Sequence, residues 1–171
     1  THLVCQGSAV SDLKHWDPVD FVGAVISAWS WAQRHRPNSS VVRTFTPTVA
    51  GDGWTCEHTV VEIVTDDMPF IIDSVVAALN GAGRTLNLVI HPVLRVTRAA
   101  DGAITAVQPQ FGNGANREDS DDARDESWVH IEIDRESNPA VMSDLTTLIE
   151  SVLNDVRDAV TDWPEMVKQV G

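Results

Sequence analysis

Basic side chains are scarce in this sequence. Its 171 residues include 12 lysines and arginines against 25 aspartates and glutamates, which gives a formal net charge of −13 with neutral histidines. Nucleic acids and anionic membrane surfaces are bound mainly by clustered lysine and arginine, so we expect no nucleic-acid partner and no membrane partner. The apolar runs also fall far short of the ~20 residues that a membrane-spanning helix requires.

Cysteine is scarce as well. Cys5 and Cys56 lie far apart in the sequence and form no C-x-x-C motif, so we expect two reduced thiols in a cytoplasmic protein. No basic segment followed by an apolar core opens the chain, which gives no support to secretion. The chain begins at Thr1 instead of methionine, and we expect it to be part of a longer protein.

Motifs of catalysis are missing too. The sequence has no G-K-[ST] phosphate loop and no G-x-S-x-G nucleophile turn, and the glycines of residues 111–116 open no predicted helix. His58, His91 and His130 fall on three predicted strands. Together with Glu132 they could ligate a metal, but such side chains are equally typical of the solvent-facing side of a strand. We expect no catalytic residue, no metal and no cofactor in this chain.

Clear helix and strand patterns are present. Residues 17–37 form a predicted helix, because Asp17 suits the N-cap, Pro18 the first helical position and Pro37 the stop. Its apolar stripe comprises Phe21, Val22, Val25, Ala28, Trp29 and Ala32. A second long helix starts at Asn138-Pro139 and should end at Pro164. Its helical-period residues are Val141, Leu145, Leu148, Ile149, Val152, Val156, Val160 and Trp163.

Four segments have strand character. Residues 40–49 and 54–64 are rich in β-branched side chains, and the turn residues 51–53 predict a hairpin between them. Residues 85–98 alternate, but Pro92 cannot donate to a sheet, so this strand is kinked or lies at an edge.

The fourth strand, residues 127–134, alternates most cleanly. Its inward side chains are Val129, Ile131 and Ile133, and its outward ones are Trp128, His130, Glu132 and Asp134. Residues 108–126 precede it and hold six acids among the nine residues from Glu118 to Glu126. This composition predicts a solvated, mobile loop, with a binding tail as the alternative.

The joint between strand 54–64 and the next helix holds Asp66, Asp67 and Pro69. In the structural interpretation either aspartate caps the helix and Pro69 lies in its first turn. In the ligand interpretation the free N–H groups of the helix start form a binding site, where two aspartates would repel an anion and favour an ammonium group. A catalytic acid pair is not supported. The helical face that follows comprises Ile71, Val75, Ala78, Leu79 and Ala82, with Gly81 or Gly83 as the stop.

The order of elements predicts an α+β, ferredoxin-like fold. From residue 54 the order is strand, helix, strand, strand, helix, which is most of the plan in which two helices cover one face of a four-stranded antiparallel sheet. The last strand of that plan is missing after Trp163. We expect the edge strand 41–48 to take its place, because an open edge there would pair with other chains. The N-terminal helix is additional.

Three stretches carry a resemblance to a known family. "VVEIVTDDMPFIIDSV", "LVIHPVLRV" and "ESWVHIEIDR", in this order, resemble the N-terminal region of the large NAD-specific glutamate dehydrogenases of bacteria, and the similarity runs from about residue 12 to 163. In that family the region is similar to an ACT domain, a ferredoxin-like module that often binds amino acids. The resemblance implies a helical lead-in (1–37), an ACT-like domain (38–164) and the start of a linker (165–171).

The resemblance also implies a function. The parent enzyme would convert glutamate to 2-oxoglutarate and ammonia with NAD, and its catalytic and NAD-binding residues would lie outside this chain. This chain would be a non-catalytic regulatory or interaction domain that contacts other domains or subunits and binds an amino-acid effector. The alternative is a purely structural oligomerisation or docking module without a small-molecule ligand.

A candidate effector site follows from the ACT pattern Asp-x-Pro-Gly-apolar, which Asp67, Pro69 and Ile71 match. Phe70 stands at the glycine position, where its ring would fill space that glycine leaves open. The candidate site residues are Asp66, Asp67, Met68, Phe70 and Ile71.

Overall fold

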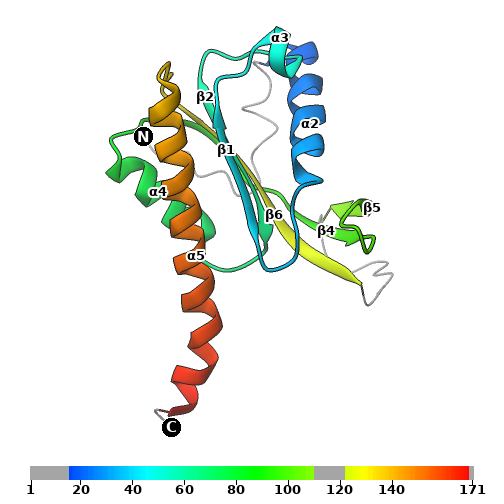
Figure 1. Cartoon of the computed structure of the whole chain (residues 1–171), viewed down its shortest axis with the longest axis vertical. Coiled ribbons are helices and arrows are strands. Elements are labelled where there is room, and N and C mark those ends of the chain that lie inside the picture. Colours follow the sequence, from blue (N-terminus) through cyan, green and yellow to red (C-terminus); the bar gives the residue numbers. More distant parts are fainter. Residues whose placement is uncertain (1–15, 110–121, 170–171) are drawn as a thin grey trace.

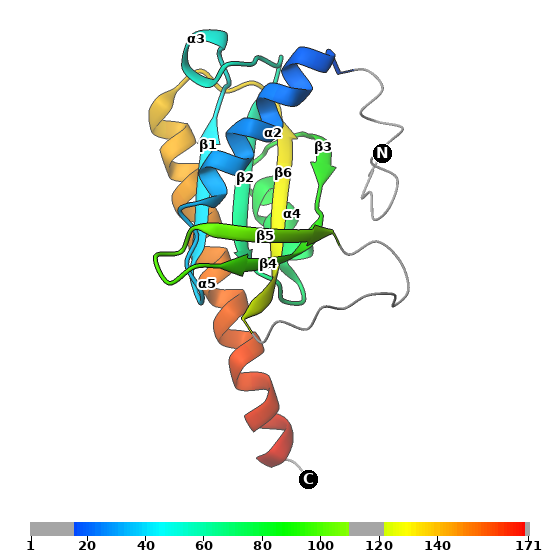
Figure 2. The ribbon, with the colours of Figure 1, turned by 90° about the vertical axis from the view of Figure 1, so that its right-hand side faces the viewer.

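The computed structural model describes residues 16–109 and 122–169, and they form an α+β fold around a six-stranded antiparallel open sheet. The elements are α2 (Pro18–Ala32), β1 (Ser40–Phe45), α3 (Val49–Asp52), β2 (Thr59–Asp66), α4 (Ile71–Gly81), β3 (Leu86–Ile90), β4 (Val93–Arg98), β5 (Ile104–Pro109), β6 (Ala123–Ile133) and α5 (Pro139–Gln169). Helices α4 and α5 lie on one face of the sheet, and α2 crosses the other face (Figure 1, Figure 2).

The sheet confirms the predicted ferredoxin-like arrangement. The strand order is β1-β2-β6-β4-β5, and β3 also pairs with β6. Strand β1 runs antiparallel to β2, with Val41 opposite Val64 and Phe45 opposite Val60. It therefore occupies the edge that the last strand of the plan would take. The connection between β1 and β2 is longer than the predicted tight turn, because α3 forms there and ends at Gly53, whose φ is 78°.

The sheet has two more strands than predicted. The segment 85–98 divides into β3 and β4 around Pro92, whose ring removes the N–H that a continuous ladder needs. Strand β5 was not among the predicted elements, and it pairs with β4 so that Val107 lies opposite Val96. Because β5 extends to Pro109 and β6 begins at Ala123, the predicted loop 108–126 is wrong at both ends, and its residues 110–121 lie outside the described part of the chain.

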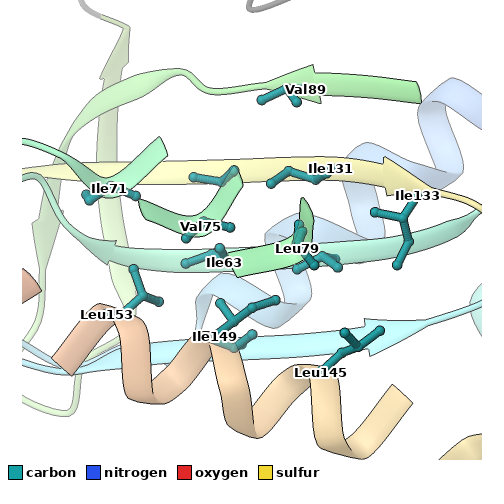
Figure 3. Packing of buried hydrophobic residues seen from close by; sticks show 13 residues of the cluster. Ile63, Ile71, Val75, Leu79, Val89, Ile131, Ile133, Leu145, Ile149 and Leu153 are labelled. Carbon is teal, nitrogen blue, oxygen red and sulfur yellow. The ribbon is translucent and has the colours of Figure 1, made fainter. Parts of the chain in front are cut away.

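The main core lies between the sheet and the helices α4 and α5 (Figure 3). It combines the inward side chains of β1, β2, β3 and β6 with one face of each helix. Its buried members are Val42, Val61, Ile63, Ile71, Val75, Leu79, Val89, Val129, Ile131, Ile133, Leu145, Ile149 and Leu153. The inward positions predicted for β6 are thus confirmed. On α5 the prediction missed Leu153, whereas the predicted Leu148 is 37% exposed.

The helix ends agree with the sequence at three points. Asp17 Oδ1 accepts a hydrogen bond from Val19 N (2.8 Å), and Asn138 Oδ1 accepts one from Ala140 N (3.0 Å), so both predicted N-caps are confirmed. At Gly83 the chain takes the left-handed φ of 74° that ends α4.

Helix α2 stops at Ala32, earlier than predicted, and α5 continues past Pro164. A proline removes one hydrogen bond and bends a helix but does not always end it.

Candidate functional site

The joint between β2 and α4 differs from the predicted capped helix start. Asp66 Oδ2 accepts a hydrogen bond from Asn38 N (2.7 Å), and Asp67 Oδ1 accepts one from Ser127 Oγ (2.6 Å). Both carboxylates therefore accept hydrogen bonds from residues that are distant in the sequence. Helix α4 begins after Phe70 without any side-chain cap, and Pro69 precedes the helix. The predicted cap by Asp66 or Asp67 and the placement of Pro69 in the first turn are wrong.

Phe70 occupies the left-handed region of backbone conformation, with φ 72°. This region favours glycine, the residue that the ACT pattern has at this position. The ring is 67% exposed, so it does not fill a buried space. It lines a surface hollow of about 330 Å³ together with Ser74 of α4 and with Val152, Asp155, Val156 and Ala159 of α5.

The other candidate site residues have different surroundings. Ile71 is 1% exposed and belongs to the main core, and Met68 packs against that core. Asp66 and Asp67 point to the hydrogen-bond donors described above. The five candidates are neighbours in the sequence, but their side chains contact different parts of the structure.

Asp67 also belongs to a partly buried chain of hydrogen bonds. Ser127 Oγ donates to Asp67, so His91 Nε2, 2.9 Å from the same oxygen, must be the donor in that contact. The hydroxyl proton points at the carboxylate and away from the imidazole, which is not the arrangement of a serine activated by a base. Burial lowers the pKa of His91, against the opposing effect of Asp67. The prediction that three strands carry His58, His91 and His130 is therefore correct only for His130, because His58 precedes β2 and His91 lies between β3 and β4.

The α2 side of the sheet buries a group of charged side chains. Glu62 and Glu132 are 3% and 6% exposed. The ring of His130 lies between them, with Nδ1 3.7 Å from Glu62 Oε1 and Nε2 3.7 Å from Glu132 Oε1. Arg43 pairs with Glu62, and His58 Nδ1 lies 2.7 Å from Glu132 Oε2. The prediction that His130 and Glu132 face solvent is wrong, because Trp16 and Trp54 pack on this side of His130.

The charges in this group stabilise one another. Burial works against a charged imidazole at His130, but the carboxylates of Glu132 and Glu62 outweigh it and raise the pKa. Burial likewise opposes ionisation of Glu132, yet His130 and His58 lower the pKa of this carboxyl. Residues 16–109 and 122–169 contain no group of three or more His, Cys, Asp or Glu side chains placed to hold a metal ion.

A second buried ion pair fixes the end of α2. Arg98 Nε and Nη2 donate to the two oxygens of Glu126 at 2.7 and 2.8 Å, and His35 Nδ1 lies 3.2 Å from Glu126 Oε1. Arg98 Nη2 also donates to the Ala32 carbonyl (3.1 Å). Burial would raise the pKa of Glu126, but Arg98 and His35 outweigh it and lower the pKa to about 2.

Glu62, Glu126 and Arg98 were not among the residues predicted to be functional. The sequence held one signal for Glu62, which is a glutamate inside the β-branched run "VVEIV". In the register of β1 and β2, Arg43 lies opposite this glutamate and can pair with it.

An apolar cleft of about 540 Å³ separates α2 from the sheet. Its walls include Phe21, Val25 and Trp29 of α2 and Ile90, Leu94 and Trp128 of the sheet. Figure 2 shows α2 lying across the strands, on the side away from α4 and α5.

Much of the apolar stripe predicted for α2 is in fact exposed. Ala24 and Ala32 are buried, whereas Val22, Val25 and Trp29 are 55%, 53% and 43% exposed. We call the exposed apolar side chains of this helix the α2 apolar surface, which consists of Val19, Phe21, Val22, Val25, Ile26 and Trp29. The stripe therefore contacts the sheet only in part.

The fold is that of an ACT-like, ferredoxin-type α+β domain, and comparisons with known proteins agree. The family described as "Glutamate dehydrogenase, ACT1 domain" matches residues 1–149. The chain is 33% identical over 168 residues to the NAD-specific glutamate dehydrogenase of Halomonas elongata, an alignment that covers 98% of this chain and 10% of that protein. It is 33% identical over 147 residues to the NAD-specific glutamate dehydrogenase of Pseudomonas aeruginosa, which covers 86% and 9%.

The chain belongs to the ACT1-domain family of glutamate dehydrogenases, and the resemblance seen in the sequence is confirmed. It spans about a tenth of the length of these two relatives. None of the helices in the described part of the chain is long and apolar enough to cross a membrane.

Proposed function

We propose that this chain is a non-catalytic interaction domain of an NAD-specific glutamate dehydrogenase, and that the α2 apolar surface docks on another part of the same enzyme. The parent enzyme would oxidise glutamate to 2-oxoglutarate and ammonia with NAD in the cytoplasm, using residues outside this chain. The observation that carries the proposal is the exposure of Val22, Val25 and Trp29 beside an apolar cleft.

Physical chemistry supports a protein partner for this surface. A helix normally buries its apolar stripe, and a contiguous exposed apolar patch commonly marks an interaction site. Aromatic side chains such as Phe21 and Trp29 are frequent anchors of interfaces. Because the relatives are about ten times as long as this chain, the rest of the parent polypeptide is the partner most directly available to cover the patch.

The test compares two sets of substitutions in the full-length parent enzyme. Val22→Asp with Val25→Asp places charges on the α2 apolar surface, and Val49→Asp is the matched control at a valine that is 69% exposed on α3. All three valines are exposed, so their replacement costs the domain itself little stability. We expect limited proteolysis to cleave within α2 faster in the double variant than in the control. Equal cleavage rates would contradict the docking proposal.

An amino-acid effector is the second candidate function. The hollow beside Phe70 supports it, because Ser74 and Asp155 offer polar groups next to the apolar Val152 and Val156. Calorimetric titration of the chain with a panel of amino acids tests it, with Phe70→Ala as the variant that should weaken binding. No binding heat from any amino acid with folded protein would discard this candidate and would leave the docking proposal untouched.

A further inference from the structure

His130 lies at the centre of the buried charged group on the α2 side of the sheet. Glu62 of β2 and Glu132 of β6, both buried, flank its ring. Nδ1 of the ring faces Glu62 Oε1 and Nε2 faces Glu132 Oε1, each at 3.7 Å. Only a protonated imidazole carries a hydrogen on both nitrogens, so the two carboxylates together favour the charged ring.

Two further charged or titratable groups contact the same carboxylates, but at their other oxygens. Arg43 Nε donates to Glu62 Oε2 (2.7 Å). His58 Nδ1 lies 2.7 Å from Glu132 Oε2. The Oε1 atoms that face His130 have no hydrogen-bond partner among the described residues. The charge of His130 is therefore what compensates both Oε1 atoms.

The segment that leads into α2 covers His130. Trp16, which lies directly before the N-cap of this helix, has its ring centroid 5.7 Å from that of His130. Trp16 also stacks on Trp54, with centroids 5.8 Å apart, and Trp54 packs on the histidine at 6.2 Å. These indoles keep water away from the charged group, so a charge imbalance there is poorly screened.

The start of α2 also carries negative charge toward this group. Asp17 and Asp20 line a cavity of about 540 Å³ whose wall includes Glu132. Removal of the His130 charge therefore adds repulsion between Glu132 and these aspartates. Strands β2 and β6 are joined by a continuous register along the whole of β2, whereas the apolar stripe of α2 contacts the sheet only in part. The start of α2 is thus the part of this region that can yield.

We propose that His130 is a pH-sensitive latch, which holds Trp16 and the N-terminal end of α2 on the sheet while its ring is positively charged. When the ring releases its proton to solvent, one of the two glutamates faces an imidazole nitrogen without a hydrogen. A buried carboxylate without compensation is costly, so the start of α2 moves away from the sheet and admits water. The latch belongs to this chain alone and depends neither on the docking of α2 nor on an amino-acid effector.

The direction of the pH dependence follows from the surroundings of His130. Burial favours the neutral ring, but the carboxylates of Glu132 and Glu62 outweigh it and raise the pKa above the ordinary value of 6.5. A group with a raised folded pKa contributes stability that is complete below its unfolded pKa and is lost as the pH rises through the folded pKa. The latch is therefore closed below pH 6.5 and opens on the alkaline side.

The test follows the 171-residue chain by NMR at constant ionic strength, from about pH 5.5 to about pH 9. The ring resonances of His130 report its protonation, and the backbone amides within residues 16–22 report the start of α2. We expect both signals to change with one common midpoint above pH 6.5, while the amides of α4 stay constant. The nuclear Overhauser contact between the rings of Trp16 and His130 should disappear on the alkaline side of that midpoint.

Variants separate the latch from a general effect of pH. Glu132→Gln removes one of the two flanking carboxylates, so the His130 midpoint should fall by about 1 pH unit or more. His91→Gln is the matched control, because His91 is a half-buried histidine that contacts Ser127 and lies outside the charged group. It should leave the midpoint unchanged. In His130→Gln, the amides within residues 16–22 should have the shifts of the alkaline wild type at every pH.

The wild-type titration decides the proposal even where a variant fails to fold. A titration of His130 that leaves residues 16–22 unchanged would overturn it, as would a midpoint below pH 6.5. An equal shift of the midpoint in His91→Gln and in Glu132→Gln would also overturn it.

Discussion

Glu126 shows how a single buried charge shapes the behaviour of this domain. It is 2% exposed, yet it stays ionised because Arg98 and His35 hold its pKa at about 2, well below the ordinary value of 4.5. A carboxyl with a depressed folded pKa contributes stability above its unfolded pKa and loses it as the pH falls through the folded pKa. The contribution of Glu126 is therefore complete above pH 4.5 and lost toward pH 2.

The prediction for Glu126 concerns the pH dependence of unfolding. Glu126→Gln should lower the free energy of unfolding at pH 7 by about 3 kcal/mol, because it leaves Arg98 buried without a counter-charge. The loss should shrink as the pH falls from 4.5 toward 2, where the wild-type carboxyl is itself protonated. Urea unfolding at pH 7 and at pH 3 measures both values, with Glu150→Gln as the exposed control. A loss that does not depend on pH would contradict this account.

Phe70 gives a prediction about backbone strain. A side chain at φ 72° costs about 1 kcal/mol relative to glycine, and the exposed ring contributes little packing. Phe70→Gly should therefore be more stable than Phe70→Ala by about 1 kcal/mol, measured by urea unfolding of both variants. Equal stability of the two variants would show that the left-handed conformation is not strained.

At the scale of elements, the position of α2 depends on one close approach. A Cβ atom at Gly23 would lie 2.5 Å from the Cβ of Trp54, so glycine is the residue that lets this helix contact the buried indole. Arg43 Nη2 also donates to Ser27 Oγ (2.7 Å) and joins α2 to β1. Helix α2 is therefore held at definite points although most of its apolar surface is open.

Two glycine substitutions with opposite expected signs test this placement. Gly23→Ala should destabilise the chain by about 1–3 kcal/mol, because the added methyl group forces α2 away from Trp54. Gly81→Ala, in α4, meets no atom within 4 Å and should stabilise by about 0.5–1 kcal/mol through helix propensity. Urea unfolding curves compare the two. A neutral Gly23→Ala would mean that α2 does not pack on Trp54 as described.

The elements also show what the sequence could and could not predict. Richness in β-branched side chains identified β2, which is buried along nearly its whole length. Alternation identified β6, and helical period identified α4 and α5. Strand β5 has six residues, ITAVQP, in which apolar and polar side chains do not alternate regularly, so the sequence carried little sign of it. The start of α4 was mispredicted because Asp66 and Asp67 have partners at Asn38 and Ser127, and contacts between distant residues are invisible to a local capping rule.

The candidate site was predictable only in part for the same reason. The Asp-x-Pro pattern located the joint, and Phe70 does occupy the position where glycine is favoured. The buried charges of Glu62, Glu126 and Glu132 were not foreseen, since alternation along a strand indicates which face a side chain shares but not whether a helix covers that face. The exposure of the α2 stripe could not be predicted either, because helical period shows which side chains share a face of the helix but not whether the sheet covers that face.

In the whole molecule, the two faces of the sheet differ in the side chains that they carry. The face toward α4 and α5 carries a closed apolar core. The face toward α2 carries buried charges, an apolar cleft and an exposed helix surface. The first face accounts for the stability of the domain, and the second offers the surface through which we propose that it contacts the rest of the enzyme.

Amide hydrogen exchange of α2 is the sharpest test of the proposed docking. The measurement compares the amides of residues 18–32 in the 171-residue chain with the same amides in the full-length parent enzyme, and α4 serves as the internal reference. We predict that exchange in α2 slows at least tenfold in the parent enzyme, which corresponds to about 1.4 kcal/mol of added protection, while exchange in α4 changes little. Equal exchange of α2 in the two proteins would contradict the claim that another part of the enzyme covers this helix.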